Sequence, residues 1–259
     1  MDSGVSKLEA MDTIRPFILH IPHSSMEIPF DLLPDFLVAE DNLDAELLRI
    51  TDHYTDELFD LPGAHRLVFP VSRFVVDPER FRDDADEPMS ARGMGALCTR
   101  THDGRPLNTV PDREALLRRF YDPHHEALGR WAREAVEEHG LALIVDCHSF
   151  PSTPLPCDLS QARPRPDTNV GTDAIHTPPE LAQGLKEALE AEGWSVGIDW
   201  PYSGTMVPTW AYGKDARVRS MLVDVRRGLY MDEAMGERLR GFDEAWRDLV
   251  KALASALSA

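Results

Sequence analysis

Apolar and polar positions follow two kinds of pattern along the chain. A short, mostly apolar run at 17–21 and a fully apolar run at 141–145 are typical of buried β-strands. Over 41–61, 112–139 and 231–257, apolar residues recur at three- and four-residue spacing, which predicts amphipathic helices. Strands that alternate with helices favour an α/β fold, with one largely parallel or mixed sheet between helices on both faces.

Shorter signals complete this outline. Thr177 and Glu180 form a capping box, so a helix is expected from there to about residue 192, with Gly193 at its end. Pro123 is expected to kink the helix at 112–139. Further strands are predicted at 66–71, 74–76, 194–198 and 220–225.

Two long stretches, 79–111 and 152–177, are polar, proline-containing and without periodicity. Loops of this length in compact domains are usually functional or disordered, so we expect them to form the walls of a cleft, with loops 82–111 and 150–177 closing over the substrate. No domain boundary is evident. We therefore expect a flexible tail at 1–13 and a single catalytic domain at 14–259.

Composition narrows the function classes. The 45 acidic and 27 basic residues give a formal net charge of -18, which repels phosphate backbones and disfavours nucleic-acid partners. The three cysteines do not form a disulfide framework. No transmembrane run or signal peptide is visible, so a cytoplasmic enzyme without membrane contacts is expected, as a monomer or small homo-oligomer.

Two histidines, His23 and His148, follow the two apolar runs. Open α/β sheets collect reactive groups at strand ends. Imidazole is the commonest neutral zinc ligand, so these two residues are predicted to share a metal ion; the alternative is that each bonds nearby backbone. A cysteine hydrolase using Cys147 beside His148 is disfavoured, because adjacent strand residues point to opposite faces. Four other histidines are interpreted as surface or structural residues: His65, His102, His139 and His176.

An acidic residue is expected as the third ligand. Asp52 and Asp56 are four residues apart, on one face of the predicted helix, and Glu27 follows His23 by four residues. Asp52 is preferred, then Glu27; spacing alone leaves the choice open. A solvated helix face is the structural alternative for the two aspartates.

Charged residues beside predicted strands supply the remaining candidates. Arg73 and Arg80 flank an apolar segment, and a guanidinium can grip a substrate carboxylate through two hydrogen bonds; the alternative is ion pairing with neighbouring acids. Asp224 lies inside an apolar run, where a carboxylate is costly unless it is paired or functional. It suits a general base, or else forms a buried salt bridge to Arg226 or Arg227.

Taken in order, segments spread over most of the chain resemble the N-formylglutamate amidohydrolase family. The matching segments are Ile21-Pro22-His23-Ser24-Ser25 with Ile28-Pro29, Thr51-Asp52, Ser72-Arg73 through Arg80, Asp103-Gly104, Pro123 with His125, Asp146-Cys147-His148-Ser149, Asn169-Val170-Gly171-Thr172, and Asp224 through Tyr230-Met231-Asp232-Glu233.

The resemblance implies a zinc carboxypeptidase-like fold with a mixed, mostly parallel sheet. It implies one zinc ion per chain, held by His23, His148 and an acidic residue, with Asp224 as base and Arg80 on the substrate carboxylate. Two positions depart from the family pattern. Glu79 replaces the usual asparagine before Arg80, and it would repel a substrate anion unless it points away or pairs with an arginine. Asp224 replaces the usual, longer glutamate.

Our leading hypothesis is a zinc-dependent hydrolase that cleaves the amide bond of a small N-acyl amino acid such as N-formylglutamate. The metal ligands would be His23, Asp52 and His148, and the catalytic residues Asp224 and Arg73. Rival hypotheses are a catalytically weakened member that binds a small carboxylate ligand, and a zinc carboxypeptidase. Substrate contacts are expected from Arg80, Arg73, Ser24 and Asn169, and hydrogen bonds to the metal ligands from Ser24 and Ser149.

Overall fold

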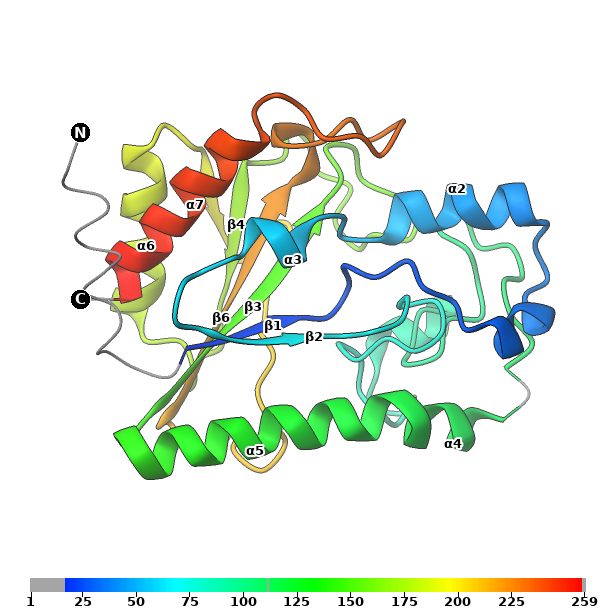
Figure 1. The fold of residues 1–259 in the computed structure, drawn as a ribbon, viewed down its shortest axis with the longest axis horizontal. Helices are drawn as coiled ribbons and strands as arrows, with labels where there is room; N and C mark the ends of the chain where they lie inside the picture. Colours follow the sequence, from blue (N-terminus) through cyan, green and yellow to red (C-terminus); the bar gives the residue numbers. More distant parts are fainter. Residues whose placement is uncertain (1–16, 111, 258–259) are drawn as a thin grey trace.

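A six-stranded sheet with the strand order β2-β1-β3-β6-β4-β5 forms the centre of the computed structural model, which describes residues 17–110 and 112–257 (Figure 1). Only β4 and β6 pair antiparallel; the other neighbours are parallel. The mostly parallel mixed sheet predicted from the sequence is therefore confirmed. The strands are β1 (Phe17–Ile21), β2 (His65–Val68), β3 (Ala142–Phe150), β4 (Thr168–Gly171), β5 (Val196–Ile198) and β6 (Val218–Arg226).

Helices cover both faces of the sheet (Figure 1). The long α5 packs Leu128, Ala132 and Val136 against one face, whereas α3, α6 and α7 contribute to the core on the other. The α-helices are α2 (Glu40–Ile50), α3 (Thr55–Leu58), α4 (Arg113–Leu116), α5 (Asp122–His139), α6 (Pro179–Ala191) and α7 (Phe242–Leu257); the π-helical η4 (Leu117–Tyr121) and the 3-10 helices η2 (Phe30–Asp35), η3 (Pro88–Arg92) and η5 (Arg227–Leu229) complete the elements.

The central strand β3 is buried at every position, as its unbroken apolar run predicts. It lies between β1 and β6, and the parallel register brings His148 opposite Asp224. Because β1 and β3 run in the same direction, the segments that follow them meet at one edge of the sheet. The adjacency of β1, β3 and β6 in the sheet and their common direction thus place the candidate residues together.

Several predicted elements differ from the structure. The helix expected over 41–61 is interrupted at residues 51–54, where Tyr54 adopts a left-handed conformation with φ 64°. Residues 74–76 form a turn rather than a strand, since the buried Val75 and Val76 pack against the loop at 94–98. The last helix begins at Phe242 rather than near residue 231, because the preceding segment turns back to pair Met231 with Arg238.

Two further predictions from the sequence are wrong. Strand β4 lies within the stretch predicted to be irregular at 152–177. Thr177 does not cap α6, because its hydroxyl donates to the carbonyl of Ser220 at 2.6 Å and so ties the start of the helix to the sheet. The tail predicted at 1–13 lies outside the described residues. No helix within 17–110 or 112–257 is long and apolar enough to cross a bilayer.

Candidate metal centre

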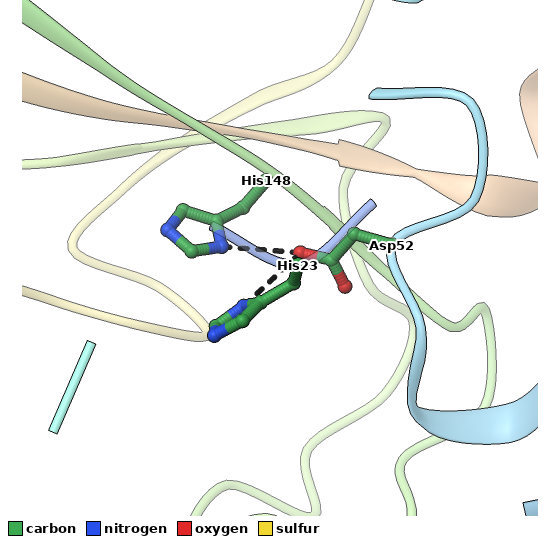
Figure 2. A group of neighbouring side chains, drawn as sticks. All are labelled: His23, Asp52 and His148. Carbon is green, nitrogen blue, oxygen red and sulfur yellow. Dashed lines mark hydrogen bonds and ion pairs between the residues drawn. The ribbon is translucent and has the colours of Figure 1, made fainter. Parts of the chain in front are cut away.

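His23 and His148 lie side by side at the carboxyl edge of the sheet (Figure 2). His23 follows β1 by two residues, and His148 lies near the end of the neighbouring strand β3. Their ring centroids are 5.0 Å apart, and both side chains are buried. Two imidazoles separated by more than a hundred residues in the sequence therefore face one small volume.

Asp52 completes this cluster from the break between α2 and α3. Its backbone N–H donates to the carbonyl of His23 at 2.9 Å, which holds the two segments together. Its Oδ2 atom lies 3.1 Å from Nδ1 of His148 and 3.6 Å from Nδ1 of His23 (Figure 2). Of the three acidic candidates, this is the one beside the imidazoles: Glu27 is exposed, and Asp56 lines a separate surface hollow with Arg66.

The outward-facing atom of each of these three side chains is fixed by a partner. Nε2 of His23 bonds Asp77 at 2.8 Å, and Nε2 of His148 bonds Asp146 at 3.1 Å. Arg227 donates to Oδ1 of Asp52 at 2.9 Å. Metal-binding histidines in proteins typically have such carboxylate partners, which set the tautomer and aim the free nitrogen at the ion.

The inward-facing atoms fit a metal ion. Nδ1 of His23 is buried without a hydrogen-bond partner, although the other nitrogen of the ring is fully used. Two imidazole nitrogens and one carboxylate oxygen form the donor set of many catalytic zinc sites, in which a fourth position takes water or substrate. The residues present therefore suit zinc.

Electrostatics at the cluster favour a cation. Burial alone would raise the pKa of Asp52, but the hydrogen bond with His148 and the nearby charges of His23 and Arg227 hold this pKa well below the usual range. Burial would lower the pKa of His148, but Asp146 and Asp52 raise it well above its usual value. The surrounding carboxylates thus draw positive charge into the cluster.

Asp224 lies next to this cluster on β6, opposite His148 in the strand register. The residue is 4% exposed, lines the cavity, and has no hydrogen-bond partner for Oδ1. Burial raises its pKa well above the usual range. The alternative salt bridge is not formed, since Arg226 pairs with Asp167 and Arg227 pairs with Asp52. Burial of the Asp224 carboxyl group therefore costs folding free energy that no ion pair offsets, which is typical of a residue kept for function.

The two candidate arginines share one counter-ion. Arg73 contacts Oδ2 of Asp77 through Nε at 3.1 Å and Nη2 at 2.7 Å, whereas Arg80 reaches that oxygen through Nε at 3.5 Å. Both line the cavity. The ion-pairing alternative thus describes Arg73 well, whereas Arg80 makes only the longer contact with Asp77 and keeps a side chain that is 25% exposed.

Tyr121 and His125, around the start of α5, hold the loop that carries Asp77 and Arg80. His125 bonds the carbonyl of Pro78 at 2.9 Å, and the hydroxyl of Tyr121 donates to the carbonyl of Arg80 at 2.8 Å. The π-helical turn η4 that ends at Tyr121 precedes Pro123, the position where a kink was expected, and such turns are frequent at functional sites. The anchoring fixes Asp77 and Arg80 relative to the sheet.

Four important residues were not assigned a role from the sequence: His20, Asp77, Asp146 and Arg227. Asp77 and Asp146 hold the histidines, and Arg227 holds Asp52. Burial alone would raise the pKa of Asp77, but Arg73, His23 and Arg80 keep it well below its usual range. The sequence does place a charged residue within or next to each recognised motif. It does not show, however, whether such a residue supports a metal ligand or reacts itself.

The cluster opens into a cavity of about 590 Å³, a size typical of small-molecule sites. As expected, both long loops supply walls, at 87–94 and 150–159; a third wall, at 201–212, was not anticipated. Ser24 does not line the cavity, and Ser149 accepts a hydrogen bond from Arg227 at 3.1 Å. The Asn169 amide contacts the backbone of Trp200 and Tyr202, and so supports the third wall.

The four histidines interpreted as surface or structural, and the cysteine of the central motif, lie outside the cavity lining. His65 and His139 are exposed, His102 bonds Glu46, and His176 is buried against backbone groups. Cys147 donates to the carbonyl of Val145 inside the core, on the face of β3 opposite His148, and burial raises its pKa well above the usual range. Its position gives no support to a cysteine nucleophile.

Comparisons with known proteins agree with this geometry. Residues 15–231 match the family model for N-formylglutamate amidohydrolase. An N-formylglutamate deformylase from Pseudomonas putida is 30% identical over 231 residues, which cover 84% of this chain and 82% of the relative. The crystal structure of an N-formylglutamate amidohydrolase from Ralstonia eutropha superposes with a TM-score of 0.79 at 26% identity, covering 93% of each chain.

A gene product of Agrobacterium tumefaciens shares the fold, with a TM-score of 0.62 at 18% identity over 94% of this chain and 91% of that one. The family model spans all six described strands, both histidines, Asp52 and Asp224. On this evidence the chain belongs to the N-formylglutamate amidohydrolase family of hydrolases.

Proposed function

We propose that this protein is a zinc-dependent amidohydrolase that cleaves the amide bond of a small N-acyl amino acid such as N-formylglutamate. The observation that supports it most strongly is the juxtaposition of the buried group His23, Asp52 and His148 with the unpartnered carboxylate of Asp224. Membership of the family supports the hydrolytic chemistry and the class of substrate.

Zinc held by His23, His148 and Asp52 would polarise the amide carbonyl and lower the pKa of a water molecule at the open position. The carboxylate of Asp224 takes a proton from the attacking water and passes it to the leaving nitrogen, so formate and a free amino acid leave as products. Its raised pKa brings a carboxyl group closer to the working pH, which suits a group that must both accept and return a proton.

Arg80 binds the carboxylate of the amino-acid part, and Arg73, which is fixed on Asp77, supports it. This anchor orients the scissile amide toward Asp224, so that less entropy is lost on reaching the transition state. Asn169 acts by holding the wall at 201–212 in place rather than by touching substrate, because both ends of its amide already have partners.

Formate release from N-formylglutamate by protein reconstituted with zinc tests the proposal. Activity that is lost with a chelator and restored by zinc is expected. Zinc-bound protein that turns over no N-acyl amino acid would contradict the proposed reaction. An Asp224→Asn variant separates the rivals: an enzyme loses rate and keeps its metal, whereas a protein that only binds a small carboxylate changes little. Release of C-terminal residues from peptides would instead favour a carboxypeptidase.

A further inference from the structure

A second group of buried charged residues contacts the candidate metal centre through Asp146, the partner of His148. His20 on β1 is fully buried, and its Nδ1 atom is 2.8 Å from Oδ1 of Asp146 and 3.0 Å from Oε1 of Glu79. Asp146 is also fully buried, whereas Glu79 borders the cavity with a side chain 14% exposed. Two carboxylates therefore converge on one imidazole nitrogen.

The two ring nitrogens of His20 and the pKa values of His20 and His124 together indicate the charge of this ring. Nε2 lies 2.8 Å from Nε2 of His124, so one of these two nitrogens must donate and the other accept. Burial and the neighbouring histidines lower the pKa of His124 to about 2, so His124 is neutral and can accept. Burial alone would lower the pKa of His20, but Asp146 and Glu79 raise it to about 9. His20 then donates from both nitrogens as an imidazolium.

The same aspartate connects this cation to the metal centre. Oδ1 of Asp146 accepts from His20 and also contacts Nε2 of His148 at 3.1 Å, whereas Oδ2 accepts from the backbone of Met206 at 2.9 Å. Glu79 comes within 3.8 Å of Nε2 of His148. Without a cation between them, the carboxylates of Asp146 and Glu79 would repel each other in a poorly solvated space, and Glu79 would be free to turn into the cavity.

We propose that His20 is a positioning residue with two effects: its imidazolium holds Asp146 in place on His148, and it neutralises Glu79 so that the cavity accepts an anion at Arg80. The first effect concerns metal affinity alone. The second rests on the proposed function, because it concerns a carboxylate substrate. The arrangement also accounts for a glutamate immediately before the arginine that is to bind an anion.

Four variants test the inference: His20→Gln, Glu79→Gln, the double variant, and His176→Gln as a matched control. His176 is equally buried, its ring nitrogens bond only the backbone of Val218 and Gly213, and it does not itself line the cavity, although its ring stacks on Tyr212. Zinc affinity of each metal-free protein is measured by competition with a chromophoric chelator. KM and kcat are then measured with N-formylglutamate on the zinc-loaded proteins.

His20→Gln is expected to weaken zinc binding about 10- to 100-fold, as is typical when the partner of a metal-binding histidine is disturbed. Its KM should rise more than its kcat falls. Glu79→Gln should change neither the zinc affinity nor KM more than about threefold, because the imidazolium of His20 already neutralises the charge of Glu79. In the double variant KM should return toward the wild-type value. Wild-type zinc affinity in His20→Gln, or a double variant with the KM of His20→Gln, would overturn the proposal.

Two further measurements decide the remaining outcomes. One zinc per chain is expected; a second equivalent that disappears in Glu79→Gln would mean that His20, Glu79 and Asp146 bind a cation instead, and would overturn the proposal. If His20→Gln does not fold, long-range ¹H–¹⁵N NMR of the metal-free wild type decides: a doubly protonated His20 at neutral pH supports the proposal, and a neutral ring refutes it. If no N-acyl amino acid is turned over, the proposed function fails, but zinc affinity still tests His20.

Discussion

Asp77 accepts a hydrogen bond from Nε2 of His23 at 2.8 Å and, through its other oxygen, pairs with Arg73 at 2.7 Å. One buried carboxylate therefore supports a candidate metal ligand and a candidate substrate anchor at the same time. Any movement of Asp77 changes both sites, and the chain offers no second acid within hydrogen-bond reach of Nε2 of His23 among its described residues.

Asp77→Asn should therefore weaken zinc binding about 10- to 100-fold and raise KM for a carboxylate substrate. The neutral amide cannot balance the positive charge of Arg73, and an amide N–H₂ group turned toward this guanidinium cannot accept its hydrogen bonds. Zinc titration and steady-state kinetics check this. Asp31→Asn, which removes an exposed partner of Arg119, is the control. Equal losses in both variants would show that Asp77 has no special role.

Asp77 also predicts a pH dependence of stability. Its folded-state pKa is depressed, so its contribution to stability is complete above the ordinary carboxyl pKa of about 4 and is lost as the pH falls below it. The free energy of unfolding of the metal-free protein should therefore fall more steeply with acidification in wild type than in Asp77→Asn. Denaturant unfolding between pH 3 and pH 6, chosen to span that range, measures the difference. Parallel curves would contradict it.

Zinc affinity should itself increase with pH. In the metal-free protein the pKa of His148 is raised, so a proton must leave this ring before it can bind a metal ion. Titrations at two pH values on either side of neutrality are expected to show tighter binding at the higher one, and His148→Ala should abolish high-affinity binding. The exposed His139→Ala should behave as wild type. Retention of zinc by His148→Ala would remove His148 from the site.

Asp224→Asn should separate catalysis from stability. We expect kcat to fall about 10²- to 10⁴-fold, the usual loss on removing a general base, while zinc remains bound. The raised pKa means that the carboxylate favours folding only in its protonated form, and that this benefit is lost as the pH rises through the folded-state pKa. At neutral pH the metal-free variant should thus unfold at a higher temperature than wild type. A lower Tm with full activity would refute the assignment.

Arg80→Lys tests the substrate anchor. A lysine keeps the charge but cannot form the two parallel hydrogen bonds of a guanidinium, so KM for N-formylglutamate should rise about tenfold or more with little change in kcat. Arg119→Lys, at an exposed ion pair, is the matched control. A KM unchanged in Arg80→Lys would place the substrate carboxylate elsewhere.

The apolar runs were sufficient to predict the central sheet. The run at 17–21 and that at 141–145 are buried on both sides and form neighbouring strands, because only a sheet covered by helices can bury such continuous segments. Local periodicity was less informative where the chain turns back on itself. The apolar residues keep helical spacing through 51–54, although the helix is interrupted there. The interruption arises because the backbone N–H of Asp52 bonds the carbonyl of His23, a contact that the apolar pattern does not reveal.

By itself, the sequence determined that this is an α/β protein with two histidines at strand ends, because strand burial and parallel order depend on the apolar pattern. Only the tertiary structure decided which acid joins those histidines and which charges support them. Asp52, Asp77, Asp146 and His20 come from four separate segments, and nothing in the local spacing tells a carboxylate beside the imidazoles from one facing solvent. Charges act through space, so their roles depend on distances that the chain sets only when it folds.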